Sequence, residues 1–231
     1  MIARIHAIQT LGTLDGPGLR TVIFLQGCPL RCFYCHNPKS WDFDGGTEMS
    51  VDELVELALK YKAYYGSNGG VTLSGGEPTA QAEFAKELFS RLREHSIHTA
   101  LDTAGPIMND AVKALLSVTD LVILDIKSTD PDEFRRITGG ELSNTLAFLS
   151  EVTGSPGLPV TPGLPATPGL PDLWIRQVII KDLNDDLAHI HALSEFLKDL
   201  DIQKVELLGS VPNLNDLQKA LDLELNTIAE D

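Results

Sequence analysis

The amino-acid sequence predicts an α/β fold in which parallel strands form a sheet that curls into a partly closed barrel. Short apolar runs that favour strands alternate with amphipathic runs that favour helices along most of the chain. A β–α–β series of this kind has right-handed crossovers, which place its strands parallel in one sheet. About six such units fit the chain, whereas a complete eight-unit barrel needs more residues. We therefore expect a single domain over residues 1–231.

The strands are predicted from short runs of β-branched and other apolar residues. The run from Arg20 to Gln26 is typical of a buried strand, and Gly27 then allows the backbone to turn into a loop. In chain order, the expected strands are Ile5–Ile8, Thr21–Leu25, Gly70–Leu73, Thr99–Asp102, Leu121–Ile126, Trp174–Ile180 and Lys204–Leu208.

The helices are predicted from apolar residues spaced three and four positions apart. The first begins at a capping box formed by Ser50 and Glu53 and ends near Tyr65, before Gly66. The later helices are expected at Ala82–Arg93, Asn109–Val118, Pro131–Ile137, Asn144–Val152 and Asp185–Leu200.

Residues 154–172 interrupt this alternation with a segment rich in proline and glycine. Three near-copies of one hexapeptide follow one another, beginning at Ser155, Thr161 and Thr167. Proline removes backbone donors and glycine adds backbone freedom, so we expect neither a helix nor a sheet ladder here. We interpret the segment as an exposed loop insertion; a polyproline-type docking motif for a partner is the alternative.

Charge and hydropathy argue against several classes of function. The chain has 33 acidic residues against 18 Lys and Arg, a formal net charge of −15, which disfavours binding to nucleic-acid phosphates. No apolar stretch approaches the ~20 residues that a membrane-spanning helix needs. The first residues, Met1–His6, alternate in polarity and do not resemble a secretory signal. We expect a cytoplasmic monomer with neither nucleic-acid nor membrane partners.

All three cysteines lie within eight residues, in the spacing Cys28-x3-Cys32-x2-Cys35. Such an odd, tight group is unsuited to a disulfide framework in a chain of this length and indicates metal or cluster ligation. A structural zinc site normally has four ligands, and His36 is the nearest candidate for the fourth. A four-iron cluster held by three thiolates leaves one iron open for chemistry. Zinc and three reduced structural thiols are the alternatives.

A glycine-rich turn follows the strand predicted at Gly70–Leu73. Gly75 and Gly76 expose backbone groups for the close approach of a ligand, and the Glu77 carboxylate is suited to hold an ammonium group. The carboxyl end of a parallel strand is where α/β proteins build their sites. We therefore expect this turn to contribute to a binding site.

Charged residues also end the later strands. Asp102 closes one strand, and Asp125 and Lys127 follow the next, so each needs a charged partner or a ligand at this depth. Structural ion pairs at the rim of the sheet are the alternative. Arg176, within Trp174–Ile180, is expected to point either into the same cavity or to the other side of the sheet.

Taken in order, these motifs resemble those of the radical S-adenosylmethionine (SAM) enzymes. The cysteines are preceded by the segment Asp15–Arg20 and followed by His-Asn-Pro, Gly-Gly-Glu, Leu-Asp-Thr and Leu-Asp-Ile-Lys. More narrowly, the chain is similar to the activating enzymes of glycyl-radical enzymes, of the kind that acts on pyruvate formate-lyase. The similarity runs from about Gly12 to Leu208, with the hexapeptide segment as its main interruption. Several motifs in one order are far more specific than any one motif.

The resemblance implies a partial (β/α)6 TIM-like barrel, a single radical SAM domain, with one [4Fe–4S] cluster and SAM as cofactors. Cys28, Cys32 and Cys35 would hold the cluster, and SAM would chelate the fourth iron through its amino and carboxylate groups. The reduced cluster would cleave SAM to methionine and a 5′-deoxyadenosyl radical. That radical would take a hydrogen atom from a backbone glycine of pyruvate formate-lyase. This chemistry belongs to the cofactors, so no acid–base catalytic residue is expected.

The resemblance also implies partners and a setting. A flavodoxin or a ferredoxin-type protein would donate the electron, and an open iron makes the oxidoreductase oxygen-sensitive, as suits anaerobic metabolism. A monovalent cation would bind Asp102, Thr103 and Asp125, and Asp15 and Arg20 would contact the protein substrate. The residues implied to contact SAM are Tyr34, Cys35, His36, Gly75, Gly76, Glu77, Asp125, Ile126, Lys127 and Arg176.

The sequence departs from the family pattern after its last predicted strand. Residues 209–212, Gly-Ser-Val-Pro, follow Leu208 where the family has Pro-Tyr-His, whose histidine helps to bind the methionyl portion of SAM. The three cysteines leave no ligands for the extra clusters of some activating enzymes, which favours the single-cluster kind. The alternative functions are activation of another glycyl-radical enzyme, such as anaerobic ribonucleotide reductase, and a metal- or cluster-binding interaction module without turnover.

Overall fold

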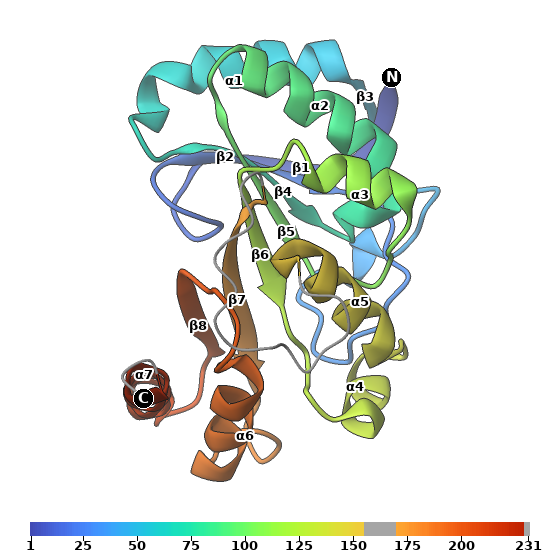
Figure 1. Ribbon diagram of the computed structural model, residues 1–231. Coiled ribbons are helices and arrows are strands. Elements are labelled where there is room, and N and C mark those ends of the chain that lie inside the picture. Colours follow the sequence, from blue (N-terminus) through green and yellow to red (C-terminus); the bar gives the residue numbers. More distant parts are fainter. Residues whose placement is uncertain (155–169, 229–231) are drawn as a thin grey trace.

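The computed structural model describes residues 1–154 and 170–228, and most of the predicted insertion at residues 154–172 lies outside these ranges. The described chain contains an eight-stranded sheet in the order β3-β1-β2-β4-β5-β6-β7-β8. From β2 to β8 along this order, every neighbouring pair of strands is parallel. The sheet curls without closing, as Figure 1 shows. The predicted α/β fold, a partial barrel of six parallel strands, is confirmed.

The predicted strands are confirmed, with ends that shift by a few residues. One further strand, β3, was missed because its four residues are polar or only half-buried and carry no apolar run. The strands are β1 (Ile2–Gly12), β2 (Arg20–Leu25), β3 (Thr47–Ser50), β4 (Gly70–Gly75), β5 (His98–Thr103), β6 (Leu121–Asp125), β7 (Asp172–Ile179) and β8 (Lys204–Gly209).

The predicted helices are also confirmed, and the capping box forms as expected. Ser50 Oγ accepts a hydrogen bond from Glu53 N at 3.3 Å, and the Glu53 carboxylate accepts one from Ser50 N at 2.7 Å. The last helix, α7, was not predicted. The helices are α1 (Val51–Tyr65), α2 (Ala82–Glu94), α3 (Asp110–Leu116), α4 (Pro131–Thr138), α5 (Leu142–Thr153), α6 (Leu187–Leu197) and α7 (Leu214–Ile228).

The alternation of strands and helices was wrong at the start of the chain. Strand β1 runs antiparallel to both β2 and β3, and no helix separates β1 from β2. Only residues 13–19 join β1 to β2, and a crossover to a parallel strand needs a dozen residues or more. The connection is therefore a hairpin, which extends the parallel sheet by two antiparallel strands.

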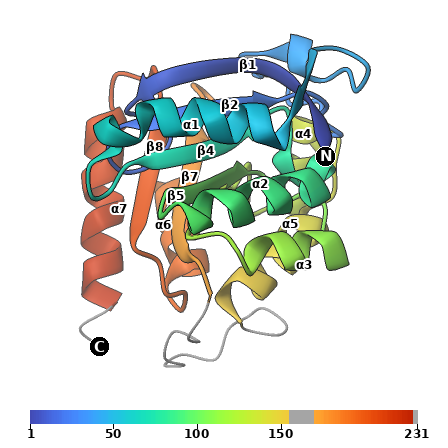
Figure 2. The same cartoon turned by 90° about the horizontal axis from the view of Figure 1, so that it is seen from above.

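The outer face of the sheet is covered by helices. Figures 1 and 2 show α1, α2 and α3 side by side over the first half of the sheet, with α1 lying along β1 and β2. Fully buried leucines from these helices, such as Leu54, Leu88 and Leu115, join the same core as Leu25 and Leu73 of the strands. No helix in the described ranges offers an apolar segment of the kind that crosses a bilayer.

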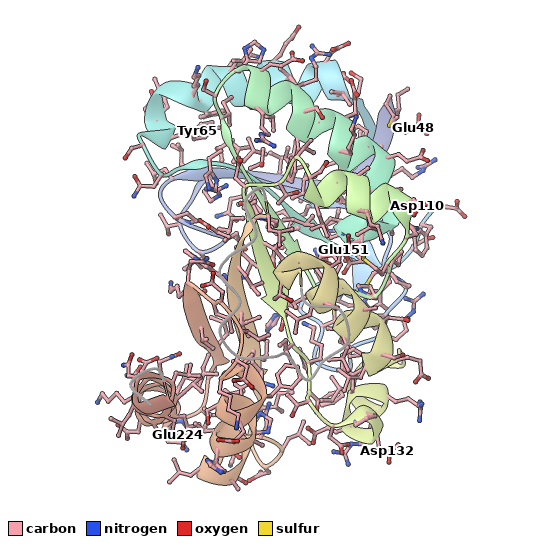
Figure 3. The ribbon with its side chains drawn as sticks, in the orientation of Figure 1. Glu48, Tyr65, Asp110, Asp132, Glu151 and Glu224 are labelled. Atoms are coloured by element: carbon pink, nitrogen blue, oxygen red, sulfur yellow. The ribbon has the colours of Figure 1, made fainter. Side chains whose placement is uncertain are left out.

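The acidic surplus is spread around the outside of the molecule. Figure 3 labels Glu48, Asp110, Asp132 and Glu224, which come from β3, α3, α4 and α7 and lie on its periphery. The first three are exposed, and Glu224 is half-buried between helices. These four acidic residues therefore do not form one cluster.

The amino ends of the parallel strands are held together by one buried cation, Arg20. Its side chain is 0% exposed. Its Nε donates to Thr72 Oγ1 at 2.6 Å, and its guanidinium nitrogens donate to the Pro17 and Val71 carbonyl oxygens at 3.0 and 2.9 Å. Burial lowers the pKa of Arg20 to about 10, so it stays charged at neutral pH. The expected contact of Arg20 with a protein substrate stays a prediction, and in this structure the side chain is fully buried.

The free edge of β8 is covered by a side chain from α7. Gln218 Oε1 accepts a hydrogen bond from Leu207 N at 2.8 Å, and Gln218 Nε2 donates to Val205 O at 3.1 Å. The amide thus occupies the position that a peptide group of a neighbouring strand would take. Unpaired edge groups promote association with other chains, so this contact protects the edge.

We expect stability to fall as the pH drops below about 6.5, in part through His98. Burial, and then the charge of Arg20, lower the pKa of His98 below the 6.5 of a free side chain. As the pH falls, His98 therefore binds a proton in the unfolded chain before it does so in the folded one. Unfolding is favoured at pH values between 6.5 and the lower pKa of the folded state. Urea unfolding of wild type and His98→Gln at pH 7.5 and 5.5 measures the effect, with His95→Gln as the matched control. A stability difference between wild type and His98→Gln that does not change with pH would contradict it.

The Gln218→Met variant is expected to lose about 1–2 kcal/mol of unfolding free energy, because two backbone groups lose their partner. Hydrogen exchange at the Leu207 amide should accelerate, which localises the effect to β8. Lys219→Met is the control, because the Lys219 side chain is 78% exposed on the same helix and its loss should change stability by less than about 0.5 kcal/mol. If the Leu207 amide hydrogen exchanged at the wild-type rate in Gln218→Met, the Gln218 side chain would not protect the edge of β8.

Candidate active site

A cavity of about 580 Å³ opens at the carboxyl ends of the parallel strands. Its walls come from the ends of β4 to β8 and from the loop after β2 that carries the cysteines. This volume lies within the range of small-molecule sites. The predicted residues that line it are Cys28, Cys32, Tyr34, Cys35, His36, Gly75, Gly76, Glu77, Asp102, Thr103, Asp125, Lys127 and Arg176.

The inner face of the sheet changes from apolar to charged along the strands. Successive inward-facing positions are two residues apart, since side chains alternate between the two faces of a strand. The apolar positions form a small buried cluster, and the charged positions that follow line the cavity. The pairs are Ala100 and Asp102 in β5, Ile123 and Asp125 in β6, and Trp174 and Arg176 in β7.

Ile126 does not line the cavity. Its side chain is 1% exposed and belongs to the apolar core on the outer side of the sheet. Its backbone N donates to Arg176 O at 2.8 Å. Of the two alternatives for Arg176, the structure selects the inward one, because its side chain lines the cavity.

The cysteine loop is attached to α4 through its backbone. Arg31 N donates to Thr138 O at 2.7 Å, and Phe33 N donates to Ile137 O at 3.1 Å. All three thiols are free, with Cys28 the most buried. Burial, followed by the charge of Glu77, raises the pKa of Cys28 to about 12. The thiolate of Cys28 therefore needs a bound cation, and metal ligation removes the thiol proton outright.

The glycine turn lies directly against the cysteine loop. Glu77 N donates to Gly27 O at 2.9 Å. A Cβ atom on Gly76 would lie 2.3 Å from this same oxygen, and one on Gly75 would lie 2.4 Å from Leu25 N. Any side chain at these positions would push the two loops apart. The Gly-Gly pair thus lets the two loops approach each other, which brings the turn beside Cys28. The close approach of a ligand to these glycines stays a prediction.

Glu77 is a buried carboxylate held by four donors. Its Oε1 accepts from Thr79 N, Thr79 Oγ1 and Thr103 Oγ1 at 3.0, 2.7 and 2.6 Å, and its Oε2 accepts from Ala104 N at 3.2 Å. Burial raises the pKa of Glu77, and these hydrogen bonds oppose that shift. Oε2 has only one of these donors, so it is the oxygen that can accept from a ligand ammonium group.

Two ion pairs line the cavity. Structural ion pairs at the rim of the sheet were the predicted alternative to a binding role for these residues. Lys127 Nζ donates to Asp125 Oδ2, and Arg176 Nη1 lies 3.7 Å from Asp102 Oδ2. Ser74 Oγ also donates to Asp102 Oδ2, at 2.8 Å. Burial raises the pKa of Asp102 to about 6, although the charge of Arg176 opposes the shift. Because these carboxylates also face the cavity, the ion pairs do not exclude a binding role.

The group predicted to hold a monovalent cation has partners inside the protein. The Thr103 hydroxyl donates to Glu77, and both carboxylates lie beside cationic side chains. Within the described ranges, no three His, Cys, Asp or Glu side chains converge as ligands of a single metal ion. The cation site at Asp102, Thr103 and Asp125 therefore stays a prediction.

The predicted substrate residue Asp15 lies on the connection between β1 and β2, outside the cavity lining. Its carbonyl oxygen accepts from Thr72 Oγ1 at 2.7 Å, and the preceding carbonyl, Leu14 O, accepts from Arg176 Nη2 at 2.8 Å. Burial raises the pKa of the half-buried Asp15 carboxyl group. The connection is therefore linked to the cavity through Arg176.

Unpaired polar atoms indicate that the cavity is built for a polar ligand. In the described part of the chain, four buried side-chain nitrogen or oxygen atoms have no hydrogen-bond partner. Three of them belong to cavity residues: Tyr34 Oη, Asp125 Oδ1 and Arg176 Nε. Buried polar groups are rarely left without partners, so a ligand with donors and acceptors is expected to complete them. Together with three free thiols, this donor set fits an iron–sulfur cluster and SAM.

Several cavity residues were not singled out from the sequence. Lys181 and Ser210 lie at the ends of β7 and β8 and line the cavity. Gly209, Ser210 and Val211, from the segment 209–212 where the sequence departs from the family pattern, line the cavity, so that departure marked the position but not its partners. Thr79 contacts Glu77 locally, two residues along the chain, in the cap of the short 3-10 helix Pro78–Gln81. Ala104 carries no local signal, because it reaches Glu77 only through the fold.

Comparisons with known proteins agree with this architecture. The model of the radical SAM superfamily matches residues 22–155. The pyruvate formate-lyase-activating enzyme of Clostridium pasteurianum is 42% identical over 210 residues, which cover 90% of this chain and 82% of that enzyme. The chain therefore belongs to the radical SAM superfamily, whose members use a [4Fe–4S] cluster and SAM. Within it, the chain belongs to the family of the pyruvate formate-lyase-activating enzymes.

Solved structures show the same fold at lower identity. SuiB of Streptococcus suis, in a crystal structure bound to S-adenosylmethionine, matches with a TM-score of 0.60 and 15% identity, covering 89% of this chain and 43% of that one. A domain of the pyruvate-formate lyase-activating enzyme of Bacteroides vulgatus matches with a TM-score of 0.55 and 23% identity, covering 70% of this chain and 95% of that one.

The Tyr34 hydroxyl tests whether a polar ligand completes the cavity. In Tyr34→Phe, the ligand-free protein should keep its stability or gain up to about 1 kcal/mol, because an unpartnered buried hydroxyl is removed. Its affinity for S-adenosylhomocysteine should fall about fivefold to tenfold. Urea unfolding and isothermal titration calorimetry of the reconstituted protein measure the two effects.

Tyr65→Phe is the matched control, because the buried Tyr65 hydroxyl lies 2.7 Å from Thr21 Oγ1, at the end of α1 in Figure 3. It should lose about 1 kcal/mol of stability and keep the affinity. If Tyr34→Phe behaved as Tyr65→Phe does, the Tyr34 hydroxyl would have a partner within the protein and no role toward the ligand.

Proposed function

We propose that this chain activates pyruvate formate-lyase by installing a glycyl radical in it. The observation that carries the proposal is the combination of 42% identity to an enzyme of that name with three free cysteines beside the Gly-Gly-Glu turn. The whole length of the relative is well represented, since the match covers 82% of it. The fold alone would support only the wider superfamily, because one fold hosts many functions.

Cys28, Cys32 and Cys35 would hold the [4Fe–4S] cluster, and SAM would bind in the same cavity. When bound, these cofactors supply electron transfer and hydrogen-atom transfer, which no side chain of the cavity supplies. The walls at Leu30, Ala104 and Val211 are buried, and such walls keep water from a reactive site. The protein therefore binds and orients the cofactors and shields them from water.

The SAM contacts follow from the groups that the cavity leaves open. Glu77 Oε2 would accept from the methionyl ammonium group, held close by the Gly75 and Gly76 backbone. Tyr34 Oη and Asp125 Oδ1 are unpartnered and suited to hydroxyl or amine groups of the nucleoside. The cation Lys127 is held beside Asp125, whose charge raises the pKa of Lys127 although burial opposes the shift. His36, Cys35 and Arg176 complete the wall.

The protein substrate would approach from the connection between β1 and β2. Asp15 lies on it, and Arg176 links it to the cavity through Leu14 O. A hydrogen-atom transfer requires the partner glycine to lie close to the cofactor, so substrate and cofactor contacts should be adjacent. A flavodoxin or ferredoxin-type electron donor, a monomeric state and a cytoplasmic location complete the proposal.

Electron paramagnetic resonance of pyruvate formate-lyase after anaerobic incubation tests the function. The chain, reconstituted with iron and sulfide and supplied with reductant and SAM, should produce a glycyl-radical doublet in the partner and release 5′-deoxyadenosine. Cys32→Ala should abolish both, because the cluster loses one of three thiolate ligands. Ser90→Ala, on the outer helix α2, is the control and should retain both.

Three outcomes distinguish the alternatives. A doublet in anaerobic ribonucleotide reductase but not in pyruvate formate-lyase would change the partner and keep the reaction. A colourless protein that binds zinc and releases no 5′-deoxyadenosine would support the interaction module. Unchanged release in Cys32→Ala would overturn the cluster assignment.

A further inference from the structure

Cys28 is enclosed by a contact between Arg31 and Trp41 that the sequence motifs did not indicate. Cys28 N donates to Trp41 O at 3.2 Å. Arg31 Nη1 donates to Cys28 O at 2.6 Å and to Leu30 O at 2.8 Å. The Arg31 guanidinium carbon lies 5.2 Å from the centre of the Trp41 ring, within cation–π distance. Both backbone groups of Cys28 are thus bound by two residues that contact each other.

Trp41 is itself a fixed platform. It follows the short 3-10 turn Pro38–Ser40, and Trp41 N donates to Pro38 O at 3.2 Å. The same turn is joined to the end of β2, because Gly27 N donates to Ser40 O at 2.8 Å. The Trp41 ring packs on the small apolar cluster of Cys28, Leu30 and Ala104. Arg31 therefore rests on a surface that the fold holds in place.

The charge of Arg31 is not neutralised by a carboxylate. Among the described residues, Arg31 forms no ion pair, whereas Arg135 and Arg136 on the neighbouring helix α4 pair with Glu141 and Glu133. The strongest charge effect on the Cys28 thiol comes from the Glu77 carboxylate, which is negative, and the cation that acts on the Cys32 thiol is Lys127. Arg31 is an exposed residue whose guanidinium is held at the Cys28 carbonyl oxygen, so it supplies a positive charge without a carboxylate partner at a fixed place beside the Cys28 backbone.

We propose that Arg31 is a positioning residue that holds Cys28 for cluster ligation and raises the reduction potential of the cluster. The inference rests on the proposed function, since it requires the cluster. Reduction adds one electron to the cluster and therefore one negative charge. A nearby positive charge favours that state, and charge and hydrogen bonding around the ligands are known to set such potentials. The electron comes from the donor protein or a chemical reductant.

Two substitutions at Arg31 separate the charge from the hydrogen bonds. Arg31→Gln removes the charge, and Arg31→Lys keeps it but loses the planar guanidinium that binds two carbonyls and stacks on Trp41. Arg91→Gln is the matched control, because Arg91 lies on α2 and pairs with Asp52 on α1. It makes the same change in net charge on the opposite side of the sheet from the cavity.

The main readout is an anaerobic redox titration of the reconstituted protein, followed by electron paramagnetic resonance of the reduced cluster. At the potential that half-reduces wild type, Arg31→Gln should show a reduced-to-oxidised ratio about threefold to tenfold lower. A tenfold change corresponds to 59 mV for one electron. Arg31→Lys and Arg91→Gln should stay within about twofold of wild type.

The second readout is the rate at which a chelator bleaches the oxidised cluster. Both Arg31 variants should bleach several-fold faster than wild type and Arg91→Gln, because the Cys28 carbonyl group loses its hydrogen bond to Arg31.

Equal reduction potentials in wild type and Arg31→Gln, or equal shifts in Arg31→Gln and Arg91→Gln, would overturn the electrostatic role. Unchanged bleaching in both Arg31 variants would overturn the anchoring role. Wild-type protein that binds no iron would overturn the proposed function as well, which separates the two failures.

Discussion

The close approach of two loops at Gly27 and Gly76 is the constraint on which the site depends. A Cβ on Gly76 would lie 2.3 Å from Gly27 O, and Glu77 N binds that same oxygen at 2.9 Å. The loop after β2 carries the thiols, and the loop after β4 carries the carboxylate. Because β2 and β4 are adjacent parallel strands, their carboxyl ends meet at one edge. The absence of a side chain at Gly76 then allows the cluster ligands and the cofactor cradle to share one wall.

A second constraint is the electrostatic balance of a buried, charged cavity. Asp102 and Asp125 each lie beside a cation, while Glu77 is satisfied by hydroxyl and amide donors. Without these partners, burial of three carboxylates would be strongly unfavourable. The pairing leaves a few atoms unsatisfied, and most of them face the cavity. The three carboxylates are therefore stabilised by their partners within the fold. Their remaining open atoms favour a ligand with both cationic and hydroxyl groups.

The sequence predicted what short-range patterns encode and missed what depends on tertiary contact. The parallel strands, the capping box at Ser50 and the cysteine spacing are local, and the structure agrees with them. Strand β3 is polar and exists because it pairs with β1. Arg20 was expected at a protein interface, yet it binds carbonyl groups from several segments. The donors at Thr103 and Ala104 meet Glu77 only after β4 and β5 have paired.

Arg176 connects the parts of the molecule that a hydrogen-atom transfer must bring together. Its guanidinium binds Leu14 O on the connection between β1 and β2, lies beside Asp102 in the cavity, and pairs with Glu206 on β8 at 3.1 Å. Any movement of that connection would therefore alter the charge balance at Asp102 and the ion pair with the open edge strand. A buried network responds as a unit, because its groups are costly to leave unpaired. The connection between β1 and β2 and the wall of the cavity are thus linked through one side chain.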